Sequence, residues 1–159
     1  MSSTSSFSSP LSSKQRTVWS LVREGFSVSA IADKLKTTRQ YVNQTRLTAE
    51  AKLSSTLLDV AETNSIQITK VYPKRAILLG YHPGLKCKAI ITYTTSHGIK
   101  VWYWNDKPEE IKNKDFLKQT RKYVLDIAKE QGIELDKTEK HPAKLAHILF
   151  KKLLPELRS

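Results

Sequence analysis

The fold is decided by the stretch SVSAIADKLKTTRQYVNQTR, residues 27–46. Ser27 can cap a short helix, and Thr37 with Gln40 three positions later can form a capping box that opens a second helix. The positions expected to face inward are apolar, namely Ile31, Ala32, Leu35 and Val42. This spacing predicts two helices that cross over a shared core, with Ala32 as the small residue at the crossing.

An earlier helix is expected to complete the bundle. Ser12 and Gln15 have the spacing of a capping box, and an apolar stripe follows at Val18, Trp19, Leu21 and Val22. Gly25 lies where a left-handed residue is expected to end that helix. Residues 11–62 contain no proline and one glycine. We therefore expect three helices, the third of which continues past Arg46.

The outward face of the third helix carries no acidic residue. It collects side chain types that read base edges, at Thr38, Arg39, Gln40, Asn43 and Gln44. Arginine suits guanine, and glutamine or asparagine suits adenine. Phosphate contacts are expected beside these residues, from Lys36, Thr37 and Arg46. The alternative interpretation is a solvated helix in a small bundle.

These residues resemble the helix-turn-helix of LuxR-type regulators, of sigma-70 region 4 and of archaeal Tfx-like DNA-binding proteins. The resemblance covers about 50 of the 159 residues and rests on LSSKQ (11–15), Val18, LVREGFS (21–27), Ile31-Ala32, Leu35, TTR (37–39) and Val42. It implies that the third helix enters the major groove. Two positions depart from the pattern. Lys36 replaces a glycine, at a cost of about 1 kcal/mol if it is left-handed, and Ala30 replaces an acidic residue.

Residues 63–110 change to the period of strands. Short β-branched and aromatic runs at 66–68, 76–80, 88–93 and 99–104 are separated by turn chemistry at 72–73, 82–84 and 96–98. Helical spacing returns at 113–131 and 142–154, with Gly132 as a stop and Pro142 as a first-turn residue. The expected fold class is α+β. A three-helix helix-turn-helix with an extended third helix precedes an antiparallel meander of about four strands, packed with two C-terminal helices.

This pattern divides the chain into three parts. Residues 1–10 are expected to be a disordered serine-rich lead, residues 11–62 the helix-turn-helix domain with its linking helix, and residues 63–159 a basic α+β module. That module is expected to serve dimerisation, effector binding or auxiliary nucleic-acid binding.

The charge points to a polyanionic partner, because 27 Lys and Arg face 15 Asp and Glu, a net charge of +12. Nucleic acid is the first candidate and an anionic membrane surface the second. Residues 1–62 carry +3 and residues 63–159 carry +9, and residues 63–105 hold six basic residues and no acidic one. Lys86, Lys88 and Lys100 are expected to contact flanking phosphates or an anionic effector.

Four aromatic residues of the meander, Tyr93, Trp102, Tyr103 and Trp104, are interpreted as core anchors. A stacking surface for single-stranded nucleic acid is the alternative.

Other functions find little support. One cysteine, Cys87, excludes an intrachain disulfide, and no signal peptide or apolar span is visible. We expect a cytoplasmic protein at the nucleoid, with no membrane partner. His82, Cys87 and His97 lack the paired spacing of a zinc site. The acidic residues at 106, 109 and 110 are most simply explained as part of a turn that leads into a helix. We therefore expect neither a metal, a cofactor nor enzymatic activity.

The third helix is predicted to continue, with an apolar stripe at Leu47, Ala51, Leu53, Leu57, Leu58 and Val60. This stripe either docks on the second module or pairs two copies. One head contacts a single half-site, so we expect a homodimer on an inverted repeat. The predicted function is sequence-specific binding of double-stranded DNA by a transcriptional regulator. The alternatives are a nucleic-acid-processing or mobile-element protein that uses the head for targeting, and a nucleoid-associated protein.

Overall fold

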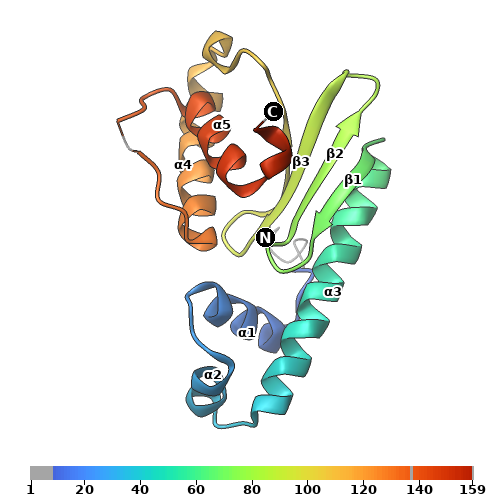
Figure 1. Ribbon diagram of the computed structural model, residues 1–159, viewed down its shortest axis with the longest axis vertical. Helices are drawn as coiled ribbons and strands as arrows, with labels where there is room; N and C mark the ends of the chain where they lie inside the picture. Colours follow the sequence, from blue (N-terminus) through green and yellow to red (C-terminus); the bar gives the residue numbers. More distant parts are fainter. Residues whose placement is uncertain (1–8, 137, 159) are drawn as a thin grey trace, which may run out of the picture. The chain divides into compact units, whose positions relative to one another are not determined.

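The computed structural model describes residues 9–136 and 138–158 (Figure 1). The elements are α1 (Ser13–Arg23), α2 (Val28–Leu35), α3 (Arg39–Thr63), β1 (Gln67–Tyr72), β2 (Ile77–His82), β3 (Cys87–Thr94), β4 (Gly98–Tyr103), η2 (Pro108–Glu110), α4 (Lys114–Gln131), α5 (Pro142–Leu153) and η3 (Pro155–Leu157). The α+β class is confirmed. The expectation for residues 1–8 of the serine-rich lead lies outside the described residues.

The chain forms two compact units, divided after Trp104. The first contains α1, α2, α3 and the sheet, and the second contains η2, α4, α5 and η3. The division predicted near residue 62 therefore does not coincide with the boundary between compact units. The reason is that α3 and the sheet share one core.

The three-helix head forms as the capping residues predict. Ser12 and Gln15 make the reciprocal capping box that starts α1, and Gly25 has a positive φ of 97° just beyond its end. The Ser27 hydroxyl accepts a hydrogen bond from the Ala30 N–H and caps α2. A small core closes the head and consists of Val18, Leu21, Ile31, Ala32 and Val42.

Two details of the predicted turn are wrong. The N-cap of α3 is Thr38 rather than Thr37, and its hydroxyl accepts a hydrogen bond from the Tyr41 N–H at 3.0 Å. The Thr37 N–H still donates to the Ala32 carbonyl at the end of α2, and α3 begins one residue later than predicted. Leu35, predicted to face inward, is 37% exposed. It is the last residue of α2, so no further turn of that helix covers it.

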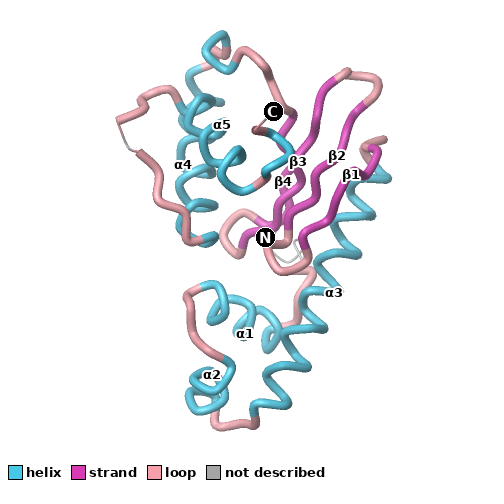
Figure 2. The backbone as a smooth tube through the Cα atoms, in the orientation of Figure 1, coloured by secondary structure: helices cyan, strands magenta, loops and turns pink. Residues whose placement is uncertain are grey.

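The sheet is an antiparallel meander in the order β1-β2-β3-β4 (Figure 2), which confirms the four predicted strands. One face carries Leu78, Ala89, Ile91 and Tyr93, which share a core with a buried stripe of α3 at Ala49, Leu53, Leu57 and Ala61. The stripe predicted beyond Arg46 thus splits in two. Leu53 and Leu57 dock on the sheet, whereas Leu47 and Leu58 stay exposed at 50% and 38%.

Trp19 connects the head to the sheet. This α1 side chain is fully buried, but it belongs to the core of the sheet rather than to that of the head. Its ring stands edge-on to Tyr93, with centroids 6.3 Å apart. Tyr93 and Trp102 are both buried, which agrees with their interpretation as core anchors, whereas Tyr103 is exposed.

Gly80 permits a close approach between β2 and the start of β1. It pairs with Ile68 of β1 and Ala89 of β3. A Cβ atom at this position would overlap the Ile66 side chain and lie 2.5 Å from the Gln67 carbonyl oxygen. The chain can leave α3 and enter β1 at this place only because position 80 has no side chain.

Replacing Gly80 by alanine should therefore lower the free energy of unfolding by roughly 1–3 kcal/mol, the usual range for overpacking. Chemical denaturation followed by circular dichroism measures this. The control is Gly84→Ala in the exposed β2–β3 turn, where a methyl group meets only the His82 ring and stability should change by less than about 0.5 kcal/mol. Equal stability of the Gly80→Ala and wild-type proteins would contradict the steric argument.

The second unit also follows its local signals. Gly132 ends α4 with a positive φ of 69°, and Pro142 is the first residue of α5. The two helices pack against each other. His141 and His147 contact the carbonyl oxygens of Ile111 and Asn105, and burial lowers the pKa of His147. Both histidines therefore contact the backbone of the same unit, and their roles are interpreted as structural.

Of the helices in the described part of the chain, none combines the length and apolar character that crossing a membrane requires.

Candidate nucleic-acid interface

The five residues predicted to read bases are all exposed, at the start of α3. At 100° per residue, positions 39, 40, 43 and 44 fall within an arc of about 140° around the helix axis. Val42 lies outside that arc and is fully buried in the head. We call Thr38, Arg39, Gln40, Asn43 and Gln44 the reading arc. The structure gathers them on one surface, and no acidic residue interrupts it.

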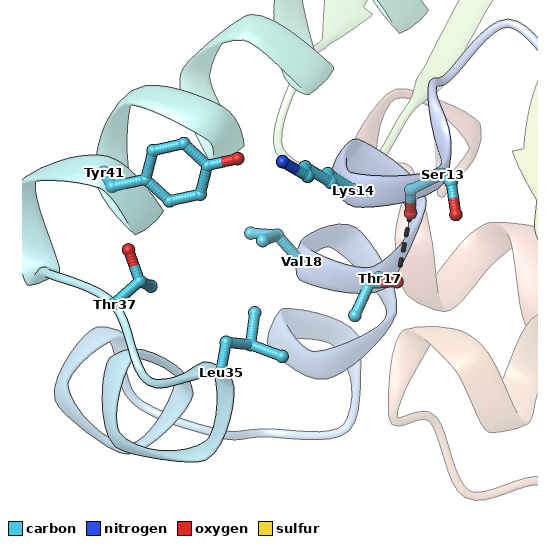
Figure 3. A pocket seen from close by; sticks show the side chains of 7 residues that line it. All are labelled: Ser13, Lys14, Thr17, Val18, Leu35, Thr37 and Tyr41. Atoms are coloured by element: carbon cyan, nitrogen blue, oxygen red, sulfur yellow. Dashed lines mark hydrogen bonds between the residues drawn. The ribbon is translucent and has the colours of Figure 1, made fainter.

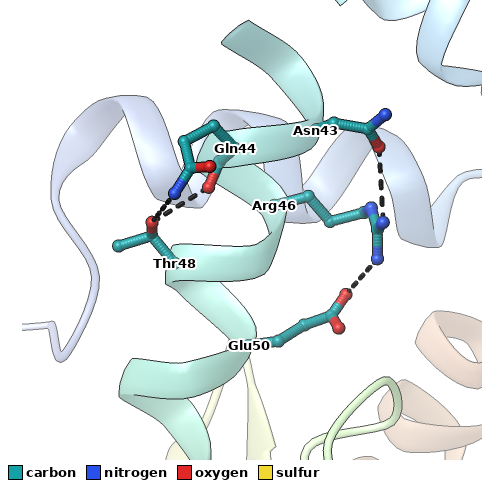
Figure 4. Close-up of polar contacts among 5 residues, drawn as sticks. All are labelled: Asn43, Gln44, Arg46, Thr48 and Glu50. Carbon is teal, nitrogen blue, oxygen red and sulfur yellow. Dashed lines mark hydrogen bonds and ion pairs between the residues drawn. The ribbon is translucent and has the colours of Figure 1, made fainter. Parts of the chain in front are cut away.

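Asn43 is held in place by a short chain of polar contacts (Figure 4). Arg46 donates from Nη2 to Asn43 Oδ1 at 3.3 Å and pairs through Nη1 with Glu50 Oε2 at 2.7 Å. The side-chain oxygen Oδ1 of Asn43 thus already accepts a hydrogen bond, while the side-chain NH₂ group can still donate to an acceptor on a base edge.

Arg46 was predicted to contact phosphate, and the structure gives it a partner within the helix. Its side chain is 22% exposed and that of Glu50 is 11% exposed. Part of its charge is therefore neutralised, and it acts on the reading arc by orienting Asn43. Sequence analysis did not single out Glu50. The spacing of four residues between Arg46 and Glu50 is the signal that could have identified the pair.

Arg39 and Gln40 are in a different state. Both are exposed, and within residues 9–136 and 138–158 neither side chain makes a hydrogen bond or ion pair. The Thr38 hydroxyl, by contrast, is already engaged in capping α3. Arg39 and Gln40 are thus the members of the reading arc that are fully available to a ligand.

The turn before α3 has a left-handed residue at Lys36, the position at which the helix-turn-helix that the sequence resembles has glycine. Its φ and ψ are 55° and 50°. The Thr37 N–H donates to the Ala32 carbonyl at 2.9 Å and closes the end of α2. The Lys36 side chain is exposed, next to the reading arc. The turn therefore places a cation beside the reading arc, and the left-handed backbone of Lys36 is strained.

Replacing Lys36 by glycine should raise the free energy of unfolding by about 1 kcal/mol, because glycine adopts this conformation without strain. Denaturant unfolding measures the change. Lys34→Gly, which removes the same charge inside α2, is the matched control and should lower stability by roughly 0.5–1 kcal/mol. If Lys36→Gly instead lowers the free energy of unfolding, the contacts of the Lys36 side chain contribute more to stability than the backbone strain costs.

The three sheet lysines are exposed but do not form one patch. Lys88 pairs with Tyr81, at the end of the sheet where β1 leaves α3, and Lys86 precedes it in the β2–β3 turn. Lys100 pairs with Thr92, four residues further along β3, or about 13 Å away. Lys86 and Lys88 therefore lie near the C-terminal end of α3, and the reading arc lies at its N-terminal end.

The positive charge is concentrated in the unit that contains the reading arc. Residues 1–104 hold 14 Lys and Arg against five Asp and Glu, a net charge of +9. Residues 105–159 hold 13 against 10, a net charge of +3. Head and sheet thus share one strongly basic unit.

The side chains considered for a metal do not come together. His82 and Cys87 pair across β2 and β3, whereas His97 lies in the β3–β4 turn at the other end of the sheet. In the described part of the chain, no three His, Cys, Asp or Glu residues form a group that could hold a metal ion. Glu109 and Glu110 belong to η2, after a turn in which the Lys107 N–H donates to Asn105.

Comparison of the chain with protein-family models, with curated proteins and with solved structures found no match.

Proposed function

We propose that the protein binds double-stranded DNA sequence-specifically through the reading arc and acts as a transcriptional regulator. The observation that carries this proposal is the exposed, acid-free arc of Arg39, Gln40, Asn43 and Gln44 on the first turns of α3. Such a role implies a cytoplasmic location at the nucleoid. The resemblance to LuxR-type, sigma-70 region 4 and Tfx-like heads supports the same assignment.

The geometry suits insertion into a groove. The major groove of B-DNA is about 12 Å wide and admits one α-helix. The arc faces away from the head core, whose contact with α3 is made by Val42, so a duplex can approach without displacing α1 or α2. The basic charge of the same unit supplies the sequence-independent attraction to phosphate.

Arg39 is expected to make the most discriminating contact, because its guanidinium can donate two hydrogen bonds to guanine. Arg39→Ala should lose roughly 1–3 kcal/mol of discrimination at one base pair of the site. The site is first selected from a random duplex pool by sequencing the retained DNA. Fluorescence anisotropy then compares the affinities for this site and for single-base variants.

Lys118→Ala is the matched control, since Lys118 is an exposed cation on α4 in the other unit. It should leave discrimination unchanged. If Arg39→Ala weakens binding to every sequence equally, the reading helix is wrongly assigned. If the wild-type protein retains all sequences equally, a nucleoid-associated role replaces regulation. Strand cleavage with a divalent metal would instead favour a nucleic-acid-processing protein.

We also propose that the protein acts as a homodimer on an inverted repeat. Leu47, Ala51 and Leu58 are exposed on α3 and recur at intervals of four and seven residues, the spacing of a helix-pairing seam. They continue the direction of the reading arc along the same side of α3. A second copy on this seam adds a second head. Two heads contact two half-sites of an inverted repeat and so raise the affinity above that of one head on one half-site.

Leu58→Glu should weaken this dimer by at least about 10-fold, because a charge replaces an apolar contact. Sedimentation equilibrium at micromolar protein, with and without a duplex that carries the selected inverted repeat, measures the effect. Leu85→Glu, at an exposed leucine of the β2–β3 turn, should leave association unchanged. A wild-type protein that remains monomeric on and off DNA contradicts the dimer.

A further inference from the structure

A pocket lies beside the reading arc, between the start of α1 and the turn that leads into α3 (Figure 3). Its volume is about 460 Å³, and it is lined by Ser13, Lys14, Thr17, Val18, Leu35, Thr37 and Tyr41. All these residues belong to the three-helix head. We call this space the α1–α3 pocket.

Three side chains that can donate hydrogen bonds, Lys14, Thr37 and Tyr41, line the α1–α3 pocket from different parts of the head. The Lys14 ammonium and the Tyr41 hydroxyl point toward each other across it, whereas the Thr37 hydroxyl lies toward the other end of the Tyr41 side chain (Figure 3). Within the described residues, none of these three side chains makes a hydrogen bond or ion pair. Thr17, by contrast, donates to the Ser13 carbonyl at 3.0 Å and is already satisfied.

The chemistry of the α1–α3 pocket is that of an anion site with an apolar floor. A lysine and two hydroxyl groups offer donors, and no acidic side chain lines the pocket. Val18 and Leu35 form an apolar surface below them. A group that combines phosphate oxygens with an adjoining C–H surface satisfies both parts, as a phosphodiester with its deoxyribose does.

The position of the pocket identifies the source of that phosphodiester. When a helix lies in the major groove, the two sugar–phosphate backbones form the walls on either side of it. Tyr41 follows the reading arc around α3, about 60° beyond Gln44 at 100° per residue. A donor group on this flank therefore faces a wall of the groove and not the base edges.

We propose that the α1–α3 pocket binds a backbone phosphodiester of duplex DNA, held by Lys14 and Tyr41. This inference rests on the proposed DNA-binding function and adds two residues, Lys14 and Tyr41, to its contacts. The contact carries no sequence information. It sets the depth and orientation of α3 in the groove, so that Arg39 and Gln40 meet base edges.

The test measures affinity for the selected duplex and for a random duplex over a range of salt concentrations. Lys14→Gln should lower the slope of log K against log salt by about 0.9, the value for one phosphate. It should weaken both duplexes by the same factor, so that their affinity ratio is unchanged. Tyr41→Phe should weaken both by roughly 2- to 10-fold with little change of slope.

Arg16→Gln is the matched control, because Arg16 is an exposed cation of the same helix that does not line the pocket. It should leave the salt slope closer to the wild-type value than Lys14→Gln does. An unchanged slope in Lys14→Gln overturns the inference, while enrichment of a motif by the wild-type protein leaves the proposed function intact. If the wild-type protein binds no duplex, both proposals fail.

Nuclear magnetic resonance distinguishes the DNA backbone from a free anion. The amide resonances of Lys14 and Tyr41 should shift on addition of duplex DNA and should shift less with inorganic phosphate at the same ionic strength. Shifts with inorganic phosphate alone, and none with duplex, would define a small-anion site and overturn the assignment to the backbone.

Discussion

Helix α3 takes part in two separate hydrophobic cores. Near its start, Val42 closes the core of the three-helix head, and further along, Leu53 and Leu57 pack on the sheet. A single helix of 25 residues, about 37 Å long, therefore fixes the head relative to the sheet. Trp19 adds a second connection, because it leaves α1 to pack beside Tyr93. Helix α3 and Trp19 thus join the head and the sheet into one unit.

The same constraint decides which surface of α3 is free. Since the buried residues are covered by the head and then by the sheet, the opposite side leaves Arg39, Gln40, Asn43, Gln44, Leu47, Ala51 and Leu58 exposed. The reading arc and the apolar seam thus follow each other along one side of one helix. A rigid helix holds side chains more firmly than a loop does, and the Arg46–Glu50 pair further restricts Asn43.

Most of the local structure could be predicted because the responsible interactions span only a few residues. The capping box of Ser12, the left-handed residues at Gly25 and Gly132 and the proline at 142 all mark helix ends that the structure confirms. The misplaced cap at Thr37 has a related cause. Thr37 and Thr38 are chemically equivalent as caps, and the structure distinguishes them because the Thr37 N–H is bonded to Ala32 at the end of α2.

The sequence by itself determined the order of helices and strands and most of the helix ends, and it singled out Arg39, Gln40 and Asn43 as one helical surface, because hydrogen bonding, turn chemistry and helical period are local. The tertiary structure alone decided which core receives Trp19, where the first compact unit ends and how far Lys86 and Lys88 lie from the reading arc. It also brought Lys14 of α1 to face Tyr41 of α3. These outcomes depend on the packing of residues far apart in the chain, and no short stretch of sequence encodes them.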